Sequence, residues 1–100
     1  MNSKELIDSV QELYAGKVAI IESKNSDYAK NDDAFSNFKF CAEFAGISVE
    51  QVFRVFIAVK IARLKELMNG KDAKNEKVED TLVDLSNYVD LLNCWLVKGE

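Results

Sequence analysis

The sequence predicts an all-α fold, a compact domain of four helices. No proline occurs among the 100 residues, so none interrupts a helix interior. Apolar residues recur at helical spacing in separate segments, with polar stretches between them. The predicted helices cover residues 3–24, 34–45, 49–69 and 76–97. A chain of this length has room for one hydrophobic core, so we expect residues 1–100 to form a single domain.

Most of these segments have a recognisable start or end. Asn2 or Ser3 can cap the first helix, because their side-chain oxygens accept a bond from its unpaired backbone N–H groups. Gly46 is suited to end the second helix, since glycine adopts the left-handed conformation without strain. The third helix begins with the capping box Ser48-Val49-Glu50-Gln51, and Gly70 follows its predicted end.

Composition excludes several classes of function. The chain has no histidine, which removes Ser-His-Asp triads, Cys-His dyads and His-ligated zinc sites. Its two cysteines, Cys41 and Cys94, form no CxxC motif, and we expect them to be unpaired. A net charge of −4 is unfavourable for binding DNA or RNA, which requires a basic surface. No apolar run is long enough to span a membrane and the start lacks a signal-peptide pattern, so we expect a cytoplasmic protein.

The third predicted helix places a charged residue at the centre of its most apolar face. At about 100° per residue, five apolar residues lie within about 40° of Lys60. They are Val49, Phe53, Phe56, Leu64 and Leu67. Arg63 flanks the same face. A lone ammonium is costly to bury, which leaves three interpretations open: a side chain that reaches solvent, an internal salt bridge, or an anion-binding site.

The first predicted helix repeats this pattern. Lys17 and Lys24 lie close to the direction of Leu6, on the apolar side of the helix. Lys24 is near the helix end, where the helix dipole favours a cation, whereas Lys17 needs another explanation. An acid on a neighbouring helix could pair with it. We predict that both lysines, together with Lys60 and Arg63, bind phosphate.

The fourth predicted helix carries two stripes. The apolar stripe, which we expect to face the core, consists of Val78, Leu82, Leu85, Val89, Leu92 and Leu96. Asp80, Asp84 and Asn87 form a polar stripe at spacings of four and three residues. Carboxylates one turn apart can share a Mg²⁺ ion with the phosphates of a ligand. They can equally pair with Lys60 and Arg63.

Aromatic residues border the polar stripe of the fourth helix. Tyr88 and Trp95 could stack on a nucleobase, or they could pack against another helix or subunit with Leu91. The third helix is apolar almost all round, so one small domain cannot easily cover both helices. These surfaces therefore predict a homo-oligomer.

Four segments of the chain resemble a family of small phage and prophage proteins known as nucleotide-modification-associated. They are KNSDYAKNDDAFSNF (24–38), AEFAGISVEQVF (42–53), VKIARL (59–64) and VEDTLVDLSNY (78–88). The strongest parts are the Lys24-Asn25-x-Asp27-Tyr28 start and the run from Glu79 to Tyr88. The family's helical fold is similar to that of the MazG-like all-α nucleoside triphosphate pyrophosphohydrolases. The resemblance therefore implies a MazG-like fold and a phosphorylated nucleotide as ligand.

The resemblance also implies roles for particular residues. Contacts to the base or sugar would come from Asp27, Tyr28, Asn37, Asn87 and Tyr88. MazG-like enzymes hold Mg²⁺ with two acidic helix motifs, E-x-x-E and E-x-x-D. The candidates for the second motif are Glu79, Asp80 and Asp84, whose spacing differs from that pattern. The first motif has only Glu43, on the second helix.

Three functions follow from these observations. The first is binding of a phosphorylated nucleotide without turnover, for example to sequester a host signalling nucleotide, which would be an anti-defence function of a phage protein in the host cytoplasm. The second is a Mg²⁺-dependent nucleoside triphosphate pyrophosphohydrolase, with Mg²⁺ as its cofactor. The third is a non-catalytic protein–protein interaction module, in which the charges on apolar faces are internal salt bridges.

Overall fold

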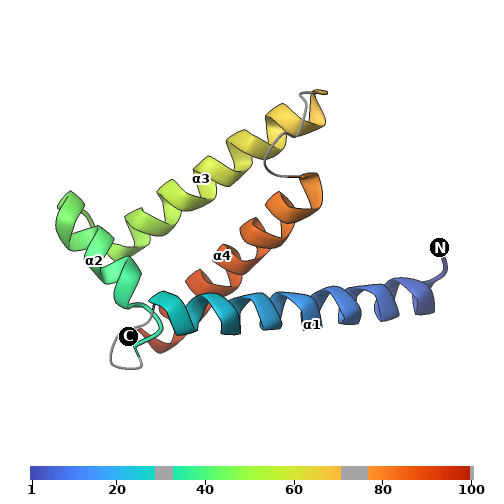
Figure 1. Cartoon of the computed structure of the whole chain (residues 1–100), viewed down its shortest axis with the longest axis horizontal. Coiled ribbons are helices and arrows are strands. Elements are labelled where there is room, and N and C mark those ends of the chain that lie inside the picture. Colours follow the sequence, from blue (N-terminus) through green and yellow to red (C-terminus); the bar gives the residue numbers. More distant parts are fainter. Residues whose placement is uncertain (29–32, 71–76, 100) are drawn as a thin grey trace. The chain divides into compact units, whose positions relative to one another are not determined.

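The computed structural model describes residues 1–28, 33–70 and 77–99, and it contains four helices (Figure 1). They are α1 (Ser3–Tyr28), α2 (Ser36–Ala45), α3 (Val49–Met68) and α4 (Val78–Lys98). No β-strand occurs in these residues. The predicted all-α class with four helices is therefore confirmed.

The chain divides into two compact units, Met1–Ala34, which contains α1, and Phe35–Glu100, which contains the other helices. Asn2 caps α1 as predicted: its Oδ1 accepts a hydrogen bond from the Glu5 backbone N–H at 2.8 Å. The Asn2 amide in turn donates to the Glu5 carboxylate at 3.0 Å. The helix continues past the predicted end at residue 24, because the residues up to Tyr28 include no glycine or proline that would stop it.

Local signals set the ends of α2 and α3 as the sequence predicts. Gly46 follows α2 with a φ of +71°, the left-handed conformation that glycine adopts without strain. The Gln51 backbone N–H donates to the Ser48 hydroxyl at 3.1 Å, and the Gln51 side chain accepts from the Ser48 N–H at 2.8 Å. This confirms the capping box. The start of α2 at Ser36, rather than 34, follows Phe35, which makes no side-chain capping bond.

Helix α4 begins at Val78 and ends at Lys98. At its start, the Asp80 carboxylate accepts a long hydrogen bond of 3.5 Å from the Lys77 backbone N–H. At its end, Gly99 has a φ of +75°. The predicted start at residue 76 lies outside the described residues.

Stacked phenylalanines form the core of the second unit. The rings of Phe38 on α2 and Phe53 on α3 stack with their centroids 4.3 Å apart, and Phe53 is fully buried. Phe35 packs edge-on against Phe53 at 6.4 Å. Aromatic pairs of this kind contribute stability beyond the area that they bury. Cys41 and Cys94 are both free, as predicted.

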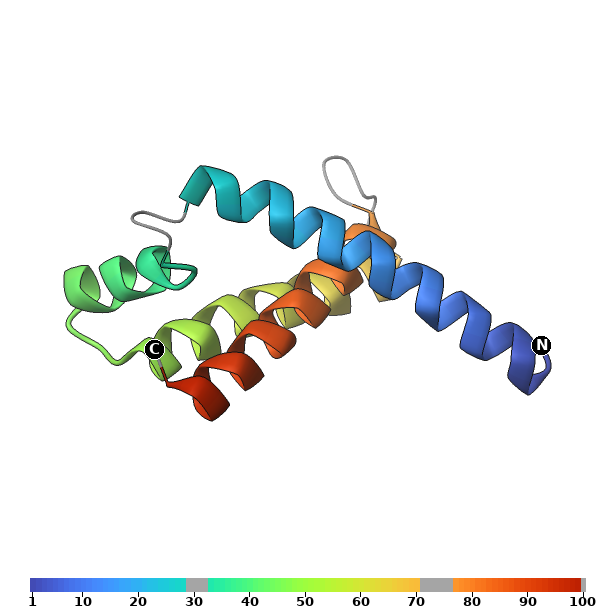
Figure 2. The same ribbon diagram turned by 90° about the horizontal axis from the view of Figure 1, so that it is seen from below.

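The prediction for the core face of α4 holds for Leu92, which packs against the core, but is wrong for three of the six residues. In that stripe, Leu82, Val89 and Leu96 are 46, 52 and 62% exposed. The helix lies alongside α3 (Figures 1 and 2). The side chains that pack inward come mainly from a different face of α4. That face includes Thr81, Asp84, Tyr88, Leu91 and Trp95. The reason is that the aromatic rings on this face reach the phenylalanines of the core, a contact that aliphatic periodicity does not reveal.

Candidate functional site

The candidate site lies where α3 and α4 run side by side, and it centres on an ion pair. The Lys60 ammonium on α3 is 3.0 Å from the Asp84 carboxylate on α4. Both side chains are about four-fifths buried, with exposures of 20 and 21%. Lys60 lies among inward-facing residues such as Phe53 and Leu67, as its position on the helix predicts. Of the three interpretations that the sequence left open, the structure shows the internal salt bridge.

Asn87 lies one turn after Asp84 on α4 and is 6% exposed. Its side-chain oxygen, Oδ1, is buried and accepts no hydrogen bond. Burial of an acceptor without a donor costs roughly 1–3 kcal/mol, so most buried acceptors are paired. The amide oxygen therefore lacks a donor, and because it is buried, a group from outside the chain would reach it only after the side chains that cover it move.

Arg63 lies one turn after Lys60 on α3, so the two cations share a side of the helix. The Arg63 guanidinium is 3.7 Å from the Glu66 carboxylate, and these side chains are 29 and 48% exposed. An ion pair of this length and exposure contributes little stability. A phosphate can therefore compete with Glu66 for the guanidinium more easily than with Asp84 for Lys60.

The aromatic residues of α4 near the site, Tyr88 and Trp95, pack against the hydrophobic core. The Tyr88 ring lies 5.6 Å from the Phe56 ring. The Trp95 indole N–H donates to the Glu50 carboxylate at 2.9 Å, and this hydrogen bond is the main cause of a lowered pKa of Glu50. This tie between α3 and α4 was not predicted, because its partners are far apart in the sequence and no motif marks them. Trp95 also packs edge-on against Phe35 at 5.3 Å.

In the first unit, the predicted residues lie along α1. The Lys17 ammonium lies 4.1 Å from the centre of the Tyr14 ring, a cation–π contact within α1. Lys24 is exposed. Asp27 and Tyr28 belong to α1, and their side chains lie outside the described part of the chain.

The predicted Mg²⁺ ligands are not gathered into one cluster. Glu43 is exposed on α2, and Glu79 and Asp80 are exposed in the first turn of α4. Asp84 is paired with Lys60. Across residues 1–28, 33–70 and 77–99, no group of three or more acidic or cysteine side chains could hold a metal ion. Asn37, which was predicted to contact the base or sugar, is exposed on α2.

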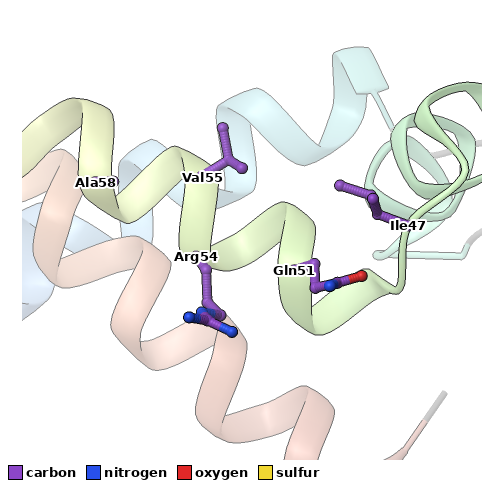
Figure 3. Close-up of a pocket in the computed structure, with 5 residues that line it drawn as sticks. All are labelled: Ile47, Gln51, Arg54, Val55 and Ala58. Atoms are coloured by element: carbon purple, nitrogen blue, oxygen red, sulfur yellow. The ribbon is translucent and has the colours of Figure 1, made fainter.

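An open groove of about 540 Å³ runs along a different side of α3 (Figure 3). It is lined by Ile47, Gln51, Arg54, Val55 and Ala58. The lining is mainly apolar and includes none of the predicted site residues. The groove is therefore separate from the site that the charged residues define.

Fold and site together define a small helical protein with a partly buried ion pair and a buried, unpartnered amide oxygen. No family model, curated protein or solved structure matches the chain. Within the described residues, no helix is long and apolar enough to cross a membrane.

Proposed function

We propose that this chain binds a phosphorylated nucleotide at the face of α3 and α4 that carries Lys60, Asp84 and Asn87. The observation that carries the proposal is the Asn87 amide oxygen, which is buried and accepts no hydrogen bond. A nucleobase N–H or a ribose hydroxyl is the kind of donor that it lacks. The cations Lys60 and Arg63 on α3 supply the positive charge that phosphates require.

The ion pair supports a role for Asp84 in positioning the Lys60 side chain. Its carboxylate holds the Lys60 ammonium between the helices at 3.0 Å. Arg63, with its longer and more exposed contact to Glu66, is the cation that would exchange its carboxylate for a phosphate. The resemblance to nucleotide-modification-associated proteins favours the same class of ligand.

We propose binding without turnover. The carboxylate nearest the site, Asp84, is engaged with Lys60, and the other predicted metal ligands are exposed on α2 or in the first turn of α4. A protein that holds a nucleotide without hydrolysing it lowers the free concentration of that nucleotide. In the phage setting that the resemblance implies, the consequence is sequestration of a host signalling nucleotide in the cytoplasm.

The test is isothermal titration calorimetry of the full chain with ATP, GTP, the four deoxynucleoside triphosphates and a cyclic dinucleotide. We expect at least one to bind, and Asn87→Leu to weaken its binding tenfold or more, about 1.4 kcal/mol. Because Asn87→Leu removes a buried acceptor that has no partner, it should leave thermal stability unchanged or raised. Asn93→Leu, at an exposed position of the same helix, is the matched control and should leave binding unchanged.

Three results would contradict the proposal. If no nucleotide binds the wild-type chain, the ligand class is wrong. If Asn87→Leu binds as tightly as the wild type, the amide oxygen does not contact the ligand. Release of pyrophosphate or phosphate in the presence of Mg²⁺ would replace binding with hydrolysis.

A further inference from the structure

The outer side of α3, opposite its buried residues, combines apolar side chains with two cations. We call it the α3 basic face, and it consists of Arg54, Val55, Ala58, Ile61, Ala62 and Lys65. These residues lie within an arc of about 120° on the helix, and all of them are exposed. Arg54, Val55 and Ala58 also line the open groove (Figure 3). The face is therefore accessible to a partner.

The two cations of this face, Arg54 and Lys65, form no ion pair with any residue that the structure describes. The nearest acids along the helix, Glu50 and Glu66, lie just outside the arc, and both engage other side chains. The chain as a whole has a net charge of −4. A face that carries two cations and no acid therefore favours an acidic partner.

Helix α1 carries a face of opposite charge on the side away from its apolar residues. We call it the α1 acidic face, and it consists of Glu5, Asp8, Glu12, Ala15, Ala19 and Glu22. These residues lie within an arc of about 100°, and all of them are exposed. Lys4, on the same side, is paired with Asp8 at 2.8 Å. Glu12 and Glu22 form no ion pair within the described part of the chain, so they can pair with cations of a partner.

The two faces have the same order of side chains. On α1 the order is Glu12, Ala15, Ala19 and Glu22, and on α3 it is Arg54, Ala58, Ala62 and Lys65. The outer charges are ten residues apart on α1 and eleven on α3, which corresponds to about 15 and 16.5 Å along the helix axis. The alanines between them are small, so the two helices can approach closely enough for the charges to meet in pairs.

We infer that the α1 acidic face of one copy of this chain binds the α3 basic face of a second copy. In a two-fold dimer this contact occurs twice, because each copy supplies both faces. Charge also selects the side of α1 that binds. The apolar side of α1 carries Lys17 and Lys24, which would repel Arg54 and Lys65. The contact uses no residue of the proposed nucleotide site, so the two proposals can fail independently.

The first experiment is sedimentation equilibrium of the full chain at micromolar concentration. We expect twice the monomer mass of 11.3 kDa for the wild type. Glu12→Lys combined with Glu22→Lys reverses the α1 acidic face, and Arg54→Glu combined with Lys65→Glu reverses the α3 basic face. Each double variant places like charges in both contacts of the dimer and should raise its dissociation constant about tenfold or more. Added salt should weaken the wild-type dimer, because it screens exposed charges.

The matched control is Glu43→Lys combined with Glu79→Lys. Both acids are exposed, on α2 and α4, and this variant changes the net charge as much as reversal of the α1 acidic face does. We expect it to dimerise as the wild type does. Circular dichroism verifies that each variant is folded.

The second experiment mixes the two face-reversed variants in equal amounts. In a mixed dimer the reversed α1 face meets the reversed α3 face, and the two unaltered faces meet each other, so both contacts are complementary again. We expect the mixture to form dimers although each variant alone is monomeric. A contact within one chain would not be restored by mixing, so failure to recover overturns the proposal. A monomeric wild type, a dimer that survives both reversals, or equal weakening by the control variant would also overturn it.

Discussion

The ion pair between Lys60 and Asp84 allows a quantitative test of its contribution to stability. Its charged atoms are 3.0 Å apart and each side chain is about one-fifth exposed, so removal of either partner leaves the other largely withdrawn from water. We expect Lys60→Met or Asp84→Asn alone to lower the free energy of unfolding by about 1–3 kcal/mol. Each kcal/mol corresponds to a fall in Tm of about 4–8 °C in a domain of this size.

The double variant Lys60→Met with Asp84→Asn separates the energy of the ion pair from the separate contributions of the two side chains. Methionine fills the volume of the lysine stem, and asparagine keeps the shape of the aspartate, so the double variant has neither a stranded charge nor a cavity. We expect it to recover about 1–2 kcal/mol relative to the sum of the single losses. The assay is chemical denaturation followed by the fluorescence of Trp95, the single tryptophan, which lies in the same unit.

The Arg63–Glu66 pair is the matched control. It lies on the same helix as Lys60, but its charged atoms are 3.7 Å apart and its side chains are more exposed. We therefore expect a coupling below about 0.5 kcal/mol for Arg63→Met with Glu66→Gln. Strict additivity of the Lys60 and Asp84 substitutions would refute the reasoning. If the double variant recovers stability and still binds nucleotide as the wild type does, Lys60 is a structural residue and does not contact the phosphate.

Three further predictions concern individual bonds and backbone positions. Trp95→Phe removes the hydrogen bond that lowers the pKa of Glu50, so NMR titration should show that pKa rising toward 4.5. Because the pKa of Glu50 is lower in the folded state, its carboxylate stabilises the folded state above the unfolded pKa of 4.5, and this contribution is lost as the pH falls through the lower, folded pKa. The variant should therefore lose less stability on acidification than the wild type. Ser48→Ala removes one bond of the capping box and should cost about 1 kcal/mol in a thermal melt, whereas an unchanged melt would show that the cap contributes nothing. Gly46→Ala places a Cβ at a φ of +71° and should cost about 1 kcal/mol, and a stabilised variant would contradict the strain argument.

Features that depend on neighbouring residues could be predicted from the sequence. The capping box joins Ser48 to Gln51, three residues away, and Asn2 caps α1 through Glu5 at the same separation. Gly46 ends α2 because of its own backbone preference. Each of these bonds is made within one turn of helix, so no knowledge of how helices pack is required.

Partners on different helices could not be predicted in the same way. The position of Lys60 on the apolar face of α3 follows from helical geometry, but its pairing with Asp84 depends on which side α4 turns toward α3. Several acids could have filled that role in the sequence. The hydrogen bond from Trp95 to Glu50 spans an even longer separation and ties the start of α3 to the end of α4. These contacts arise from packing, and helical spacing carries no information about them.

The core face of α4 shows why periodicity alone is insufficient. Both faces of this helix have helical spacing, and the predicted apolar stripe contains more aliphatic residues than the face that packs against α3. This face is buried because Tyr88 and Trp95 contact the aromatic rings of the core and because Asp84 forms an ion pair with Lys60. Asp84 is favourable on this buried face because Lys60 on α3 pairs with it.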